Sequence, residues 1–173
     1  MDEVKNAIRT VPDYPKPGIL FYDITTILQD PRHLKTVIDG LTERYAPMEI
    51  SKVLAMESRG FIFGAPLADR IGAGFVPLRK PGKLPWKTIS ESFQLEYGTD
   101  SLEMHEDAVT EGERVLLFDD VLATGGTAGA SVRLARKKGA QIVEAGFVIE
   151  LTFLGGRDKL SDVPVYSMIQ FDS

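Results

Sequence analysis

Residues 115–129 constrain the fold of this chain more than any other stretch. Four apolar residues, Val115 to Phe118, are typical of a short buried strand. Two adjacent acids follow, then a loop of small residues from Ala123 to Thr127, then a helix-like run from Ala128 to Lys138. In open α/β sheets, ligands bind beyond the carboxyl ends of the strands. The sequence therefore predicts a strand, a loop and a helix with a ligand site at the turn between them.

The loop has the chemistry of a phosphate site. Gly125 and Gly126 allow backbone angles and close approaches that a Cβ forbids, so their N–H groups can face an anion. Thr124 and Thr127 add hydroxyl donors, and the following helix adds unpaired N–H groups and a positive dipole end. The chain contains neither Gly-x4-Gly-Lys-Ser/Thr nor Gly-x-Gly-x-x-Gly, which excludes two common nucleotide-binding motifs. An ordinary glycine-rich turn stays the alternative.

The two acids, Asp119 and Asp120, need a different partner from the loop. A pair of carboxylates repels phosphate but suits sugar hydroxyls, which donate hydrogen bonds, or a divalent metal. A phosphate site beside such a pair indicates a phosphorylated sugar as the ligand. The alternative is a solvated pair of acids that only ends the strand.

A basic segment follows another predicted strand, Phe75–Leu78. Residues 79–87 contain four basic side chains in an acidic protein, and their prolines and glycine keep the segment out of helix and sheet. A basic loop after a strand can hold a polyphosphate. A solvated charged loop is the alternative.

Three polar strand ends are expected to meet. A third predicted strand, Lys52–Met56, ends in Glu57-Ser58-Arg59-Gly60, and strands and helices alternate from residue 31 to residue 151. Such alternation predicts parallel strands joined by right-handed crossovers. The ends at 57–60, 79–83 and 119–127 then fall on one edge of the sheet, where they would bind an anionic phosphosugar.

The remaining elements are predicted from local patterns. Residues 1–18 end in a proline-rich run and are expected to be extended, and Pro66 is expected to delay the regular start of the helix that ends at Ile71. The other predicted elements are a helix from Asp30-Pro31 to Tyr45, a hairpin over 90–104 around a Gly-Thr-Asp-Ser turn, and strands over 141–151 and 165–171.

Composition excludes several classes of protein. A chain of 173 residues with a net charge of −5 is a poor candidate for non-specific nucleic-acid binding. It has no cysteine, which excludes disulfides and thiolate chemistry, and its two histidines, His33 and His105, are expected to be surface residues. No apolar run is long enough to span a membrane, and the first residues do not have the pattern of a signal peptide.

The stretch around the two acids resembles the phosphoribosyl-diphosphate signature of the type I phosphoribosyltransferases. Motifs at 13–21, 57–64, 79–85 and 95–98 resemble those of the adenine phosphoribosyltransferases within that family. The resemblance covers nearly the whole chain. It implies an α/β fold in one domain, 1–173, with a central, mostly parallel twisted sheet flanked by helices. It also implies a small N-terminal hood over residues 1–30 that binds the base, and a mobile lid loop over 81–98.

The resemblance also implies an activity. The chain would transfer the phosphoribosyl group from 5-phospho-α-D-ribose 1-diphosphate to adenine, giving AMP and pyrophosphate in purine salvage. Mg²⁺ would arrive with the substrate, without dedicated protein ligands, and the protein would be a cytoplasmic homodimer that binds neither nucleic acid nor membrane. Two alternatives stay open: transfer to another purine base, and a non-catalytic regulator that senses phosphoribosyl diphosphate and binds RNA or DNA.

Roles follow by resemblance for the matched residues. Asp119 and Asp120 would hold the ribose hydroxyls at the reacting centre, and Glu96 would manage the purine proton as general acid or base, unless it is a surface acid of the hairpin. The residues implied in binding the phosphate and diphosphate groups are Ala123, Thr124, Gly125, Gly126, Thr127, Ser58, Arg59, Arg79, Lys80, Lys83 and Tyr97. The residues implied in binding adenine are Leu20, Phe21 and Tyr22, the last standing where an arginine is often found. A buried arm is the alternative for that segment.

Overall fold

The computed structural model describes residues 1–95, 98–160 and 162–173. The chain divides into two compact units, Met1–Glu43 and Arg44–Ser173. In the ranges that the structure describes, none of the helices has the length and apolar character that crossing a membrane requires.

The first unit contains two short helices, a two-stranded antiparallel sheet and most of a longer helix. Its elements are α1 (Asp2–Ala7), β1 (Arg9–Pro12), β2 (Leu20–Asp23), α2 (Thr25–Gln29) and α3 (Pro31–Tyr45), which runs on into the second unit. Helix α1 corrects the prediction of an extended segment over 1–18. The prolines begin only at Pro12, and Val4 and Ile8, one helical turn apart, are both buried.

An ion pair links β1 and β2 at the end of the hairpin opposite its turn. Arg9 and Asp23 face each other across β1 and β2, with Arg9 Nη2 2.6 Å from Asp23 Oδ2. This contact and the hydroxyl and backbone N–H of Thr25 lower the pKa of Asp23 to about 2. The rings of Tyr14 and Phe21 pack edge to face, with their centroids 5.1 Å apart.

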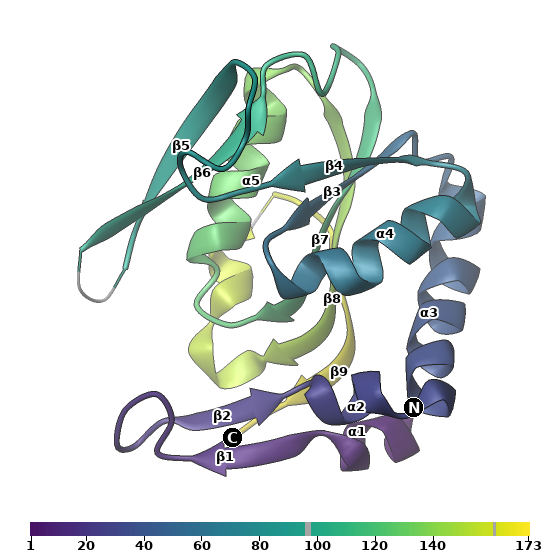
Figure 1. Cartoon of the computed structure of the whole chain (residues 1–173), viewed down its shortest axis with the longest axis vertical. Helices are drawn as coiled ribbons and strands as arrows, with labels where there is room; N and C mark the ends of the chain where they lie inside the picture. Colours follow the sequence, from purple (N-terminus) through teal and green to yellow (C-terminus); the bar gives the residue numbers. More distant parts are fainter. Residues whose placement is uncertain (96–97, 161) are drawn as a thin grey trace. The chain divides into compact units, whose positions relative to one another are not determined.

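The second unit is built on a five-stranded sheet in the order β4-β3-β7-β8-β9, in which every neighbouring pair is parallel (Figure 1). The predicted α/β fold with a central parallel sheet flanked by helices is confirmed. Its elements are η1 (Ala46–Met48), β3 (Lys52–Met56), α4 (Arg59–Ile71), β4 (Gly74–Leu78), β5 (Thr88–Gln94), β6 (Thr99–His105), β7 (Arg114–Leu122), α5 (Gly126–Lys137), β8 (Gln141–Leu151), η2 (Thr152–Leu154), η3 (Gly156–Leu160) and β9 (Val165–Phe171).

Helices α4 and α5 cover opposite faces of this sheet (Figure 1). Because side chains alternate along a strand, neighbouring residues of β3 and β7 serve different layers. Leu54 and Leu117 belong to the apolar cluster that includes the buried face of α5. A Cβ on Gly64 of α4 would instead meet Ala55 and Phe118, which point to the other face. The sheet therefore has both faces buried, as parallel sheets usually do.

Two local predictions in this unit are wrong. Helix α4 begins at Arg59 and passes through Pro66 without interruption. Proline removes one helical hydrogen bond, to the carbonyl of Ile62, and this residue is 43 % exposed, so the bond is lost on the solvent side of the helix. The hairpin turn was expected at residues 98–101, but Thr99 already pairs with Gln94 in the antiparallel ladder of β5 and β6.

The β5–β6 hairpin packs against α5 (Figure 1). Glu91 of β5 lies between two cations of the helix, 2.9 Å from Arg133 Nε and 2.6 Å from Lys137 Nζ. These contacts lower the pKa of Glu91. The segment 81–98, for which the sequence predicts a lid, thus contains a strand held to α5, and its motion stays a prediction.

Candidate active site

Three polar strand ends meet at one edge of the sheet, as the sequence predicts. Strands β4, β3 and β7 are neighbours and run parallel, so their carboxyl ends lie on the same edge. The N–H of Glu57, just after β3, donates to the carbonyl of Leu78 at the end of β4 (3.0 Å). Arg59 Nε lies 2.5 Å from Asp120 Oδ2 of β7. The contact between Arg59 and Asp120 joins residues that are 61 apart in the sequence.

The loop from Ala123 to Gly125 joins β7 to α5 and has the geometry of an anion site. Gly125 precedes the helix with φ of 76°, in the left-handed region that favours glycine, and the helix begins at Gly126, two residues earlier than expected. A cavity of about 80 Å³ is lined by residues between Asp119 and Ala128. The first N–H groups of α5 have no partner within the helix, and its dipole favours a negative charge here.

The two acids lie within β7 rather than beyond its end, because the strand continues to Leu122. Asp120 is buried, with 3 % of its surface exposed, and its carboxylate pairs with Arg59. Asp119 accepts the N–H of Asp120 (2.8 Å). Burial and the neighbouring carboxylate of Asp120 raise the pKa of Asp119 well above its ordinary value, because a second negative charge here is costly. The pair thus offers one carboxylate and one carboxyl that holds its proton at higher pH.

Glu57 organises the basic segment after β4. Its Oε2 lies 2.5 Å from Lys83 Nζ, its Oε1 accepts the N–H of Lys80 (2.5 Å), and Arg79 Nε is 3.5 Å away. Burial raises the pKa of Glu57, but Lys83, the Lys80 N–H and Arg79 outweigh it, so the pKa lies below its ordinary value. The buried carboxylate therefore keeps its charge among these donors.

Lys80 has a partner in the hairpin. Its ammonium group pairs with the carboxylate of Asp100 in β6, which lowers the pKa of Asp100. The backbone of Arg79 also pairs with Glu103 of β6 in both directions, at 3.0 and 2.7 Å. The start of the basic segment is thus held by the hairpin as well as by Glu57.

Sequence reasoning assigned no role to Glu57 or Asp100, although both lie close to the expected cations. Both acids lie outside the basic run of residues 79–87 in the sequence, so which acid meets which cation depends on the fold. Ser58 lies where predicted, directly before α4, and its peptide bond with Glu57 is cis. Glu96 and Tyr97, predicted for catalysis and substrate binding, lie outside the described residues.

The residues predicted to bind adenine belong to the first unit. All three lie on β2, where Tyr22 is 6 % exposed and Leu20 is 42 % exposed. Burial raises the pKa of the Tyr22 hydroxyl. In this unit Tyr22 therefore contributes to the core, and Leu20 offers more of its side chain to a ligand.

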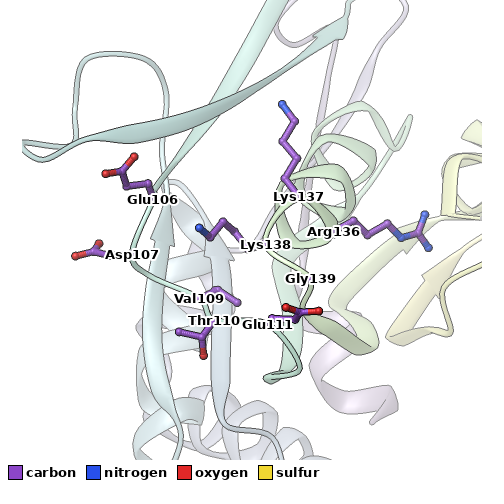
Figure 2. Close-up of a pocket in the computed structure, with 9 residues that line it drawn as sticks. All are labelled: Glu106, Asp107, Val109, Thr110, Glu111, Arg136, Lys137, Lys138 and Gly139. Carbon is purple, nitrogen blue, oxygen red and sulfur yellow. The ribbon is translucent and has the colours of Figure 1, made fainter.

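A separate groove of about 660 Å³ lies at the opposite edge of the sheet, between the connection from β6 to β7 and the last turn of α5 (Figure 2). Its lining consists of Glu106, Asp107, Val109, Thr110, Glu111, Arg136, Lys137, Lys138 and Gly139. Two of its cations are already paired: Arg136 with Asp162 and Lys137 with Glu91, each at 2.6 Å. Acids and bases are mixed along the groove, which gives it no charge preference like that of the strand-end site.

Comparisons with known proteins agree with this geometry. Residues 23–169 match the phosphoribosyl transferase domain. The adenine phosphoribosyltransferase of Solibacter usitatus is 55 % identical over 172 residues, which cover 99 % of both chains. The crystal structure of the adenine phosphoribosyltransferase from Thermoanaerobacter pseudethanolicus superposes with a TM-score of 0.95 at 50 % identity, covering 98 % of this chain and 99 % of that one. The Saccharomyces cerevisiae enzyme, solved with an imino-altritol bisphosphate and adenine, gives 0.91 at 40 % identity, covering 96 % and 97 %.

Proposed function

The chain belongs to the adenine phosphoribosyltransferases of the phosphoribosyl transferase family, and from this premise we propose that it converts adenine and 5-phospho-α-D-ribose 1-diphosphate into AMP and pyrophosphate. The observation that carries the proposal is the meeting of a phosphate loop, a carboxylate pair and a set of cations at the ends of β7, β3 and β4. A sugar with a phosphate at one end and a diphosphate at the other matches all three groups.

The 5-phosphate is assigned to the loop of residues 123–127. The unpaired N–H groups at the start of α5 and the hydroxyls of Thr124 and Thr127 donate to its oxygens. Asp120 accepts hydrogen bonds from the ribose hydroxyls, and Asp119 takes part as its partly buried neighbour. The ribose is thereby fixed between its two phosphate groups, which orients its C1 for reaction.

The diphosphate is assigned to Ser58, Arg59 and the basic residues Arg79, Lys80 and Lys83. As the bond from C1 to the diphosphate breaks, positive charge develops on the ribose and negative charge on the leaving group. Cations already placed at the strand ends stabilise that negative charge without further reorganisation. The purine N9 then forms the new bond to C1.

Mg²⁺ belongs to the proposal as a group carried by the substrate. Carboxylate oxygens suit this ion, and Asp120 and Glu57 are the candidates at the strand ends. Both are already bonded to cations, Arg59 and Lys83, which supports ligands supplied mainly by the substrate. When bound, the ion adds positive charge to the leaving diphosphate.

The base end of the reaction rests on the resemblance. Leu20, Phe21 and Tyr22 are proposed to contact adenine. Glu96 is proposed to handle the purine proton and Tyr97 to contact the phosphoribosyl group from the segment 81–98. The homodimer and the cytoplasmic location are proposed on the same ground.

The test is an assay of AMP formation. Purified protein with Mg²⁺, adenine and 5-phosphoribosyl 1-diphosphate is expected to form AMP and pyrophosphate in equal amounts. Hypoxanthine and xanthine, added in competition, are expected to react far more slowly than adenine. No AMP would overturn the proposal, and a preference for another base would shift it to that purine. Tight binding to nucleic acid at physiological salt, without AMP formation, would favour the regulator.

A further inference from the structure

The cations assigned to the diphosphate all face acids of the protein itself. Arg59 pairs with Asp120, Lys80 pairs with Asp100, and Lys83 pairs with Glu57. Arg79 Nε lies 3.5 Å from the same Glu57 carboxylate. A ligand with several negative charges therefore meets cations that are already neutralised, and it must exchange places with protein carboxylates.

Glu57 is the acid best placed for such an exchange. Its side chain is 7 % exposed, and its two oxygens together face Lys83, the N–H of Lys80 and Arg79. One anionic group held by two cations and a backbone N–H is the arrangement that a phosphate group also requires. The Lys83 side chain is 46 % exposed, so it can turn from Glu57 to a ligand, while the buried Glu57 carboxylate keeps the N–H of Lys80 and Arg79 as partners.

We propose that Glu57 is an internal counter-ion that occupies the basic segment in place of the diphosphate, and that Lys83 leaves Glu57 when the diphosphate binds. The inference rests on the proposed function, because it takes the diphosphate site as given. Glu57 then lowers the affinity for the leaving group while keeping the loop charged and ordered. An enzyme that must release pyrophosphate after each turnover benefits from a carboxylate that takes the cation back.

The direction in which one substitution changes the Kd for pyrophosphate tests this proposal. Glu57→Gln keeps the shape of the side chain and can still accept the N–H of Lys80, but it removes the charge. Titration calorimetry with inorganic pyrophosphate, at fixed salt and Mg²⁺, is expected to give a Kd roughly tenfold lower than that of the wild type, as for removing a unit charge near an anion. An unchanged or higher Kd overturns the proposal, because an acid that merely holds the loop in place gives that result.

Two further measurements make the test specific. Glu113→Gln removes another acid that faces a lysine and a backbone N–H, Lys52 Nζ at 2.9 Å and the N–H of Thr110 at 2.7 Å, at the opposite edge of the sheet, and is expected to leave the pyrophosphate Kd unchanged. In a Lys83→Met background, Glu57→Gln is expected to give a much smaller gain. A gain of the same size in that background contradicts an exchange through Lys83.

A crystal structure of the wild type with pyrophosphate tests the exchange without any variant. Lys83 Nζ is expected within hydrogen-bond distance of a pyrophosphate oxygen and beyond 4 Å from Glu57. Lys83 still paired with Glu57 and apart from the ligand overturns the proposal. The AMP assay of the wild type separates this proposal from the proposed function. If the wild type forms AMP but Glu57→Gln has an unchanged pyrophosphate Kd, only the counter-ion proposal is wrong. If Glu57→Gln binds pyrophosphate more tightly but the wild type forms no AMP, only the proposed activity is wrong.

Discussion

The backbones of Gly125 and Gly156 are in direct contact: a Cβ on Gly125 would overlap the carbonyl oxygen of Gly156. In turn, a Cβ on Gly156 would overlap the carbonyl oxygen of Ala123. The loop from Ala123 to Gly125 therefore packs directly against η3, which begins at Gly156. This contact and the positive φ of Gly125 each require glycine at this position, whether or not a ligand approaches it.

Gly156→Ala tests whether this contact positions the loop. The added methyl group must push the backbone at Ala123 away, which we expect to cost about 1–3 kcal/mol of stability. It should also raise the KM for 5-phosphoribosyl 1-diphosphate by about tenfold or more, since small displacements of binding groups are costly. Steady-state kinetics and urea unfolding measure both effects. Gly74→Ala is the control, because its Cβ would meet only ordinary contacts, at 3.5 Å or more; equal effects in both variants would contradict the positioning role.

Asp120→Asn is expected to weaken the binding of 5-phosphoribosyl 1-diphosphate. An amide accepts hydrogen bonds from ribose hydroxyls less strongly than a carboxylate, so the Kd should rise by about ten- to a hundredfold. Titration calorimetry gives the value. The matched control is Asp162→Asn, which also takes the charged partner from an arginine, Arg136, but at an exposed position. An unchanged affinity in Asp120→Asn would remove the hydroxyl-binding role.

Glu150 makes the stability of η3 depend on pH. Its side chain is 3 % exposed and binds Arg157 through both oxygens, at 2.6 and 2.7 Å, and it also accepts from the hydroxyl of Ser167. Burial raises the pKa of Glu150, but Arg157 and Ser167 outweigh it, so the pKa is lowered on folding. A lowered pKa gives a stabilisation that is present above the unfolded value, about 4.3, and is lost as the pH falls through the folded value.

Glu150→Gln is therefore expected to lower the free energy of unfolding by about 2 kcal/mol at neutral pH. The figure lies below that of a fully buried pair because 42 % of the Arg157 side chain is exposed. The deficit should shrink as the pH falls below the unfolded value of about 4.3 and through the lower folded value. Urea unfolding of wild type and variant at several pH values measures it, with the exposed Glu111→Gln as control. A deficit that does not change with pH would contradict the assignment.

Glu96→Gln tests the proton-handling role that the resemblance gives to this residue. We expect kcat to fall by about 10² or more, with the affinity for 5-phosphoribosyl 1-diphosphate largely kept, because the residue would act on the base in the transition state. Glu106→Gln, in the connection after β6, is the control for a general effect of charge. Unchanged turnover in Glu96→Gln would leave Glu96 outside the chemistry.

The parts of the fold that depend on local signals were predictable. The strands Lys52–Met56, Gln141–Leu151 and Val165–Phe171 have the predicted bounds, because each is an apolar run between turn-forming residues. The start of α3 at Pro31 was also predictable, and Asp30 accepts the N–H of Arg32 there (2.8 Å). The meeting of polar strand ends followed from the parallel alternation alone.

The partners of the site residues were not predictable. Glu57 and Lys83 are 26 residues apart, and Arg59 and Asp120 are 61 apart, so their pairing depends on the order of the strands in the sheet. Sequence patterns also gave too much weight to proline at Pro66, since α4 runs through it from Arg59 to Ile71. The contact of Gly125 with η3 could not be predicted from the sequence, because turn geometry alone also explains a glycine in a loop.

The β5–β6 hairpin is held at both ends of one helix, and this limits how it can move. Phe93 of β5 lies against the start of α5, with its Cδ2 3.1 Å from where a Cβ on Gly126 would be, while Glu91 is tied to the later turns through Arg133 and Lys137. The hairpin is thus attached to α5 both at the first turn of the helix and at its later turns. A swing of the hairpin would either break these contacts or carry α5 with it. A movement of the hairpin would therefore also displace the first turn of α5, whose residues line the cavity between Asp119 and Ala128.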